Sequence, residues 1–247
     1  MVGLLLWNQG NRFPRPVHLR EVSVLHVRFL CAAPTRGAQT PASVQRRRLR
    51  AAGKKLLRQG VERVVMPRDA PQDALPEGLR PAGTLPLRRA MAADWCGELL
   101  RLRGENPAAA RVLVTADALS GEVVRTVTEL ALRHRWLLLE VPCGGEELCR
   151  RLRREYGVSV LLHPAAGEPA AVQIAFDPAE RRGESFLPLY DEALPMPRLL
   201  LPPELEARLP EGANRGQMLS VLWEMGALRP GQVSLRLESA GEPAEPA

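Results

Sequence analysis

The sequence predicts an α/β protein in which helices cover both faces of a mostly parallel β-sheet, a three-layer arrangement with roughly five or six strands. Residues 111–164 carry this prediction, because three short apolar runs alternate there with two helix-like segments, the order that βαβ units produce. The runs at 112–114, 136–139 and 158–162 are nearly continuous in apolar residues, as expected of strands covered on both faces. At 247 residues, the chain can bury a substantial core without disulfides or metal.

The N-terminal part of the chain has a similar layout. Apolar runs predict strands over residues 2–7, 22–30 and 61–66. A helix is predicted over residues 41–59. Thr40 can cap its start, Pro41 suits its first turn and Gly60 ends it.

The later elements are less regular. In chain order we expect a loop over residues 67–81, a helix over 86–103, an antiparallel edge strand over 171–176, a proline-rich segment over 187–212, a helix over 215–225 and a strand over 232–237. The domain organisation that follows is one α/β domain over residues 1–180 with halves 1–105 and 106–180, an extension over 181–238 packed on it, and a disordered tail over 239–247.

Positive charge is concentrated near the N-terminus. The net charge is +6, but residues 1–68 carry 14 basic side chains against two acidic ones. All but two of the chain's basic residues are arginine, a usage typical of GC-rich bacterial genomes. This segregation favours an anionic partner or an internal electrostatic contact.

Cysteine and histidine spacing argues against several classes of site. The four cysteines form no C-x-x-C pair, which disfavours zinc and disulfides and favours a cytoplasmic location. The four histidines have no H-x-x-x-H or H-E-x-x-H spacing, so no metal site is predicted. The run at residues 2–7 resembles a strand rather than a secretory signal, and no apolar stretch has transmembrane length, so we expect no membrane partner.

Residues 116–121, Ala-Asp-Ala-Leu-Ser-Gly, come closest to a ligand-binding motif. They follow a strand and open a helix, and Glu140 comes about twenty positions later, as in a dinucleotide fingerprint. The stretch 111–164 therefore resembles Rossmann-type domains in architecture.

The fingerprint itself is degenerate. Only its third glycine is present, as Gly121, and Asp117 adds negative charge where a phosphate would bind. We favour an ordinary strand-to-helix turn capped by Ser120 over a dinucleotide site.

A second strand-to-helix turn, Cys143-Gly144-Gly145, allows two interpretations. Paired glycines favour close approach of the backbone to a ligand, whereas Glu146 and Glu147 stabilise a helix start and would repel phosphate. We favour helix capping. The candidate ligand-binding residues from both turns are Asp117, Ser120, Gly121, Glu140, Cys143, Gly144 and Gly145.

If the strands are parallel, one edge of the sheet collects the polar residues that follow them, where α/β proteins usually bind ligands. The residues expected to share this edge are Cys31, Asp69, Asp117, Ser120, Cys143 and His163. The alternative is that polar loops supply such groups by chance.

The helix predicted over residues 41–59 carries seven positive charges. The candidate nucleic-acid contacts are Arg46, Arg47, Arg50, Lys54 and Arg58, with Arg48 and Lys55 broadening the cationic face. No aromatic residue lies in this helix to stack on bases, and charge runs are more often solvated than specific, so we favour a solvated surface helix over a nucleic-acid contact.

Together these patterns predict a Rossmann-like α/β protein that acts as a non-catalytic binding or regulatory module for a small molecule or nucleotide. One alternative is a nucleotide- or dinucleotide-dependent enzyme that uses Asp117, Ser120, Glu140 and Cys143. Another is a nucleic-acid-binding protein that uses the basic helix. No particular cofactor or oligomeric state follows from the sequence.

Overall fold

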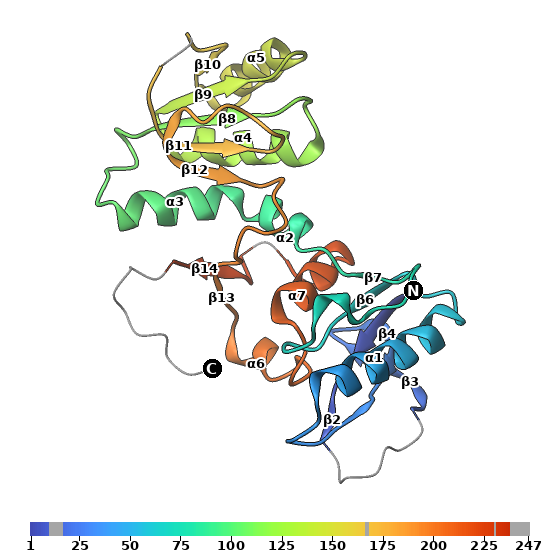
Figure 1. Cartoon of the computed structure of the whole chain (residues 1–247). Helices are drawn as coiled ribbons and strands as arrows, with labels where there is room; N and C mark the ends of the chain where they lie inside the picture. Colours follow the sequence, from blue (N-terminus) through green and yellow to red (C-terminus); the bar gives the residue numbers. More distant parts are fainter. Residues whose placement is uncertain (10–16, 166–167, 230, 238–247) are drawn as a thin grey trace. The chain divides into compact units, whose positions relative to one another are not determined.

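The computed structural model describes residues 1–9, 17–165, 168–229 and 231–237 (Figure 1). The chain divides into two compact units: unit 1 comprises Met1–Thr84 and Leu201–Val233, and unit 2 comprises Leu85–Leu200 and Ser234–Ala247. Each unit has its own five-stranded sheet, so the prediction of one sheet running through both halves is wrong. The mixed α/β class with parallel sheets is confirmed.

Unit 1 is built on a sheet with the strand order β3-β4-β1-β6-β7. The strands are β1 (Val2–Leu5), β3 (Leu19–Val24), β4 (Val27–Ala32), β6 (Arg63–Val65) and β7 (Arg80–Pro81). Strand β3 pairs antiparallel with β4, and the other neighbours pair parallel. A short parallel pair joins β2 (Asn8–Gln9) to β5 (Thr35–Arg36).

Helix α1 (Ala42–Leu57) supplies much of the core of unit 1. Its inner face buries Leu49, Ala52 and Leu56 in one apolar cluster with Leu5 and Val64. The remaining elements of the unit are η1 (Gln72–Ala74), α6 (Pro203–Glu206) and α7 (Arg215–Glu224).

Helix α7 is fixed to the end of β6 by hydrogen bonds. The backbone N–H of Met66 donates to Gln217 Oε1 at 2.8 Å, and that of Asn214 donates to the Met66 carbonyl at 2.7 Å. The Asn214 side chain caps the helix by accepting from the Gln217 N–H. The later segment of the chain therefore completes unit 1.

Two local predictions in unit 1 are wrong. Residues 22–30 are two strands joined by a turn, in which Leu25 and His26 have φ angles of 46° and 71°. Two-residue hairpins of this kind usually carry Asn or Gly, so the sequence shows no signal of the turn. Thr40 does not cap α1; its hydroxyl accepts from the Gly37 N–H at 2.9 Å.

Unit 2 contains the βαβαβ run that the sequence predicted. Its sheet has the strand order β10-β9-β8-β11-β12, and all neighbours pair parallel. The strands are β8 (Arg111–Thr115), β9 (Trp136–Glu140), β10 (Val160–Leu162), β11 (Ala170–Ala175) and β12 (Gly183–Pro188). The helices are α2 (Leu85–Ala90), α3 (Ala92–Leu102), α4 (Gly121–Arg133) and α5 (Gly145–Tyr156).

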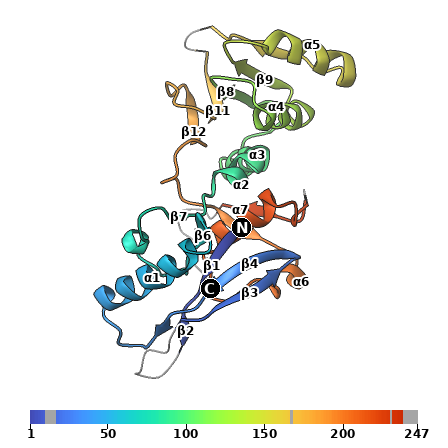
Figure 2. The same ribbon diagram turned by 90° about the vertical axis from the view of Figure 1, so that its right-hand side faces the viewer.

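The helices of unit 2 form one layer. Helix α3 contacts α4, and α4 contacts α5. Figure 2 shows α4 and α5 on the same side of the sheet, with α3 beside α4. The expected three-layer arrangement is therefore not confirmed.

Strand β11 is not the antiparallel edge strand that the sequence suggested. It lies inside the sheet and pairs parallel with both β8 and β12. The chain returns from β11 to β12 through residues 176–182, which contain no helix. Parallel neighbours usually need a longer crossover, so this short return must be held in place by specific contacts.

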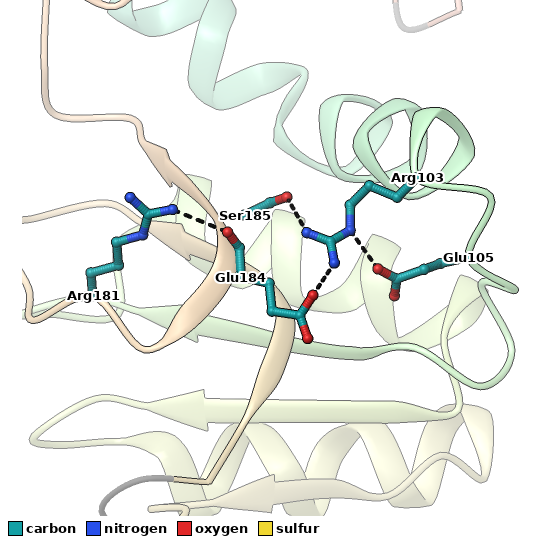
Figure 3. A network of polar contacts seen from close by, with 5 residues as sticks. All are labelled: Arg103, Glu105, Arg181, Glu184 and Ser185. Atoms are coloured by element: carbon teal, nitrogen blue, oxygen red, sulfur yellow. Dashed lines mark hydrogen bonds and ion pairs between the residues drawn. The ribbon is translucent and has the colours of Figure 1, made fainter.

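A polar network fastens the edge strand β12 to the end of α3 (Figure 3). The Arg103 guanidinium donates to Glu105 Oε1 at 2.5 Å, to Ser185 Oγ at 3.2 Å and to the Glu184 carboxylate. These bonds raise the pKa of Arg103. Arg181 donates in addition to the Glu184 carbonyl at 3.1 Å.

The proline-rich region is shared between the units. It contains β13 (Arg198–Leu200), which pairs antiparallel with β14 (Ser234–Arg236) in unit 2, and the short helix α6 of unit 1. The predicted tail 239–247 lies outside the described residues. No helix in the described part of the chain is long and apolar enough to cross a membrane.

Candidate functional site

A cavity of about 680 Å³ lies at the carboxyl ends of the strands of unit 2. The residues that line it follow β8, β9, β10 and β11, which end at the same edge because they run parallel. The lining consists of Thr115, Ala116, Asp117, Glu140, Val141, Pro142, His163, Asp177, Pro178, Ala179, Glu180 and Arg182.

The cavity lining is acidic. The lining contains four acidic residues, one arginine, Arg182, and one histidine, His163. The carboxylates belong to Asp117, Glu140, Asp177 and Glu180. This balance favours ligands that donate hydrogen bonds or carry positive charge, and it disfavours phosphate.

The only described cation of the lining is already paired. Arg182 forms an ion pair with the Glu140 carboxylate, and its side chain is 17% exposed. Asp177 accepts a hydrogen bond from the Asp117 N–H at 2.9 Å, which joins the loops after β8 and β11. The Asp117 and Glu180 carboxylates have no ionic partner among the described residues, so they are available to a ligand.

Gln173 on β11 places the residues of the return loop. Its side chain is completely buried, and its amide donates to the Glu180 carbonyl at 2.9 Å. Its Oε1 accepts from the N–H groups of Arg182 and Gly183 at 2.6 and 3.1 Å. One side chain therefore holds the return to β12 and brings Glu180 and Arg182 to the cavity.

Thr115 adds a hydroxyl group that forms no hydrogen bond to the described residues. It lines the cavity at the end of β8, is 5% exposed, and its Oγ1 has no hydrogen-bond partner among the described residues. Buried hydroxyls are rarely left unpaired, so this group is unusual. His163, which follows β10 and also lines the cavity, has a φ of 51°, an unusual angle for a residue other than glycine.

The structure brings together some of the predicted edge residues. Asp117 and His163 line the cavity, together with Glu140, a candidate ligand-binding residue that was not among the six. Cys31 and Asp69 belong to unit 1, where Cys31 is fully buried in β4 and Asp69 contacts Arg36 at 3.5 Å. The prediction that all six residues share one edge is therefore wrong, because it assumed one sheet.

The first strand-to-helix turn is a helix cap. Ser120 Oγ accepts from the Val123 N–H at 3.3 Å, as predicted. A Cβ atom on Gly121 would meet nothing within 4 Å, so no close approach requires a glycine there. Glu122 in the first turn of α4 pairs with Arg89 at 3.1 Å. The cap occupies one N–H of the helix start, and the acidic side chain of its first turn disfavours a bound anion.

The glycines of the second turn are explained by packing. Gly144 has a φ of 80°, and a Cβ there would lie 2.9 Å from Leu119. A Cβ on Gly145 would lie 2.5 Å from Leu162. Cys143 is exposed and does not line the cavity. Neither glycine therefore needs a ligand to account for it.

Sequence reasoning missed Gln173, Asp177, Glu180 and Arg182. A signal for Gln173 was present, since it is a polar residue within the apolar run at 171–176. The other three lie in a charged stretch that has the composition of an ordinary surface loop. Their role depends on the short parallel return, which sequence periodicity does not reveal.

The basic helix lies in unit 1, and its cationic residues face outward. Arg46, Arg47, Arg50, Lys54 and Arg58 are all exposed. Helix α1 itself spans Ala42–Leu57, close to the predicted limits.

No group of three or more His, Cys, Asp or Glu side chains in the described ranges is placed to hold a metal ion.

Comparison with known proteins assigns no family. No family model matches the chain, and no curated protein matches it either. Among solved structures, the chain is similar to L-tryptophan dehydrogenase from Nostoc punctiforme at 13% identity, with a TM-score of 0.28. The match covers 60% of this chain and 44% of that one, so the chain spans less than half of that protein. A likeness this weak carries no argument about activity.

Proposed function

We propose that this protein is a binding module whose unit 2 holds a small, donor-rich molecule at the carboxyl edge of its parallel sheet. The observation that carries the proposal is the acidic cavity, whose lining contains four acidic residues and Thr115, a residue whose buried hydroxyl has no hydrogen-bond partner among the described residues. Carboxylates accept hydrogen bonds from hydroxyl and ammonium groups, and a threonine hydroxyl can donate or accept. The ligand class is therefore a polyol, a nucleoside without phosphate, or an amine.

The acidic lining disfavours the nucleotide-dependent alternative. A phosphate in this cavity would face the carboxylates of Asp117, Asp177 and Glu180, while the Arg182 guanidinium is paired with Glu140. The start of α4 is capped by its own Ser120. Both features weaken the two usual sources of phosphate affinity, cationic side chains and free helix N–H groups.

A binding role fits the site better than a catalytic one. Arg182 neutralises the Glu140 carboxylate and Asp177 is engaged by the Asp117 backbone, so neither acid is arranged as a base beside a nucleophile. Cys143, the nucleophile considered from the sequence, lies outside the cavity lining.

Thermal unfolding with a ligand panel tests the proposal. The panel contains ribose, adenosine and spermidine as donor-rich probes, and AMP and NAD as phosphate-bearing probes. A ligand that binds only the native state adds about 2.7 kcal/mol of stability at a hundredfold excess over its Kd, which raises Tm by several degrees. We expect a shift with a donor-rich probe and none with AMP or NAD.

Variants locate any shift in the cavity. Asp117→Asn with Glu180→Gln removes two exposed carboxylates from the lining and should abolish the ligand-induced shift. Glu146→Gln with Glu147→Gln removes the same charge from the exposed start of α5 and should preserve it. A Tm shift caused by NAD would exclude the proposed ligand class. A shift that persists in the Asp117→Asn/Glu180→Gln variant would exclude the cavity as the binding site.

A further inference from the structure

The outward face of α1 and its C-cap residue carry an unneutralised stripe of four cations, which we call the α1 stripe: Arg47, Arg50, Lys54 and, at the cap, Arg58. All four are exposed, and none has an acidic partner in the part of the chain that the structure describes. The other cations of this helix are engaged, because Arg46 pairs with Asp73 at 3.2 Å, and Arg48 and Lys55 donate to backbone carbonyls.

The α1 stripe is regular. Its members are three or four residues apart, so they lie on one face of the helix in steps of about 4.5–6 Å along its axis. Like charges at this spacing repel one another, and α1 contains no acidic residue to relieve them. Dipole stabilisation explains cations in the last turn, such as Lys54, but not Arg47 in the first half of the helix.

The surroundings do not compensate the stripe. Unit 1 carries 18 basic side chains against nine acidic ones. An uncompensated cationic surface of this kind attracts polyanions, and a nucleic-acid backbone presents phosphates in a row that a row of cations can follow.

Helix α1 is unsuited to binding a membrane surface by insertion. An interfacial helix must place its apolar face in lipid, but Leu49, Ala52 and Leu56 are fully buried in the core of unit 1. No aromatic side chain lies in α1 to stack on bases. The contact would therefore be electrostatic and independent of base sequence.

We infer that the α1 stripe is a nucleic-acid-binding surface that contacts the phosphate backbone without reading sequence. This inference rests on unit 1 and is independent of the cavity in unit 2.

Fluorescence anisotropy with a labelled 20-base-pair DNA duplex and a mixed-sequence single-stranded RNA tests it. Four cations that each neutralise one phosphate of the duplex predict a slope of log K against log salt of about −3.6. The variant R47Q/R50Q/K54Q/R58Q should bind at least about tenfold more weakly at 50 mM salt, with a shallower slope. Two DNA duplexes of different sequence should bind alike.

A charge-matched control separates the stripe from net charge. R150Q/R151Q/R153Q/R154Q removes four arginines from α5 in unit 2 and should leave affinity within about twofold of wild type, because α5 lies outside the stripe. Circular dichroism checks that each variant is folded, and R47Q/R50Q alone serves if the fourfold variant is not.

Three results would overturn the inference. They are no binding by the wild type at 25 mM salt, equal losses in the stripe and α5 variants, and binding to vesicles with anionic lipid but not to either nucleic acid.

Discussion

The Gln173 side chain is completely buried. Its amide group is hydrogen-bonded to the backbone of the loop that returns to β12, at Glu180, Arg182 and Gly183. We predict that Gln173→Leu lowers the free energy of unfolding by about 2–4 kcal/mol, because the N–H groups of Arg182 and Gly183 lose their acceptor. Chemical denaturation measures this loss.

The same change on the surface is the control. Gln59→Leu at an exposed position should change stability by less than about 0.5 kcal/mol. If Gln173→Leu were as mild, the amide would not be what holds the return loop.

His134 makes stability depend on pH. Its side chain is 6% exposed, Nδ1 lies 3.0 Å from the Pro107 carbonyl, and burial lowers the pKa of the imidazole. Below pH 6.5 the unfolded chain takes up a proton that the folded protein resists, so stability is complete above this pH and falls as the pH decreases. Between pH 7.5 and 5, His134→Gln should therefore lose less stability than wild type.

Denaturation of both proteins at the two pH values measures the difference. His18→Gln, at an exposed position, should retain the wild-type pH dependence. An unchanged pH dependence in His134→Gln would show that His134 does not contribute.

The starts of helices α4 and α5 respond differently to alanine. Gly144→Ala places a side chain at a φ of 80° and 2.9 Å from Leu119, which should cost about 1–3 kcal/mol. Gly121→Ala meets open space at the first position of α4 and should be neutral or stabilise by up to about 1 kcal/mol. Thermal unfolding compares them.

This pair of variants also tests the dinucleotide fingerprint. If Gly121 served a cofactor, its alanine variant would lose binding without losing stability. If the two variants were equally destabilised, the αL conformation of Gly144 would not explain that glycine.

The four free thiols report on native packing across both units. Cys31 and Cys96 are fully buried, and burial raises the pKa of Cys96 to about 12. Burial also raises the pKa of the partly buried Cys149, whereas Cys143 is exposed. Since the thiolate is the reactive form, a thiol reagent at pH 8 should label Cys143 first and the buried pair only on unfolding.

Mass spectrometry after timed labelling measures the order. A Cys143→Ser variant should lose the fast phase, and the denatured wild type should react at four sites. Fast labelling of Cys96 in the native protein would contradict the packing of α3.

Much of the secondary structure was predictable because it depends on local patterns. The apolar runs of β8 and β9, the helical pattern of α1 and the Ser120 cap of α4 depend on residues that are close together in the sequence. The hairpin at Leu25 and His26 was not predictable, because those side chains do not prefer positive φ and tertiary contacts must stabilise the turn.

The sequence by itself determined the α/β class, the βαβαβ run and the cationic face of α1, and it predicted a polar edge that includes Asp117 and His163. Only the tertiary structure decided that two sheets form, that β11 pairs parallel on both sides, and that Asp177, Glu180 and Arg182 complete the cavity. The physical reason is that strand periodicity shows which side chains are buried but not which strands pair, because pairing is a property of contacts distant in the chain.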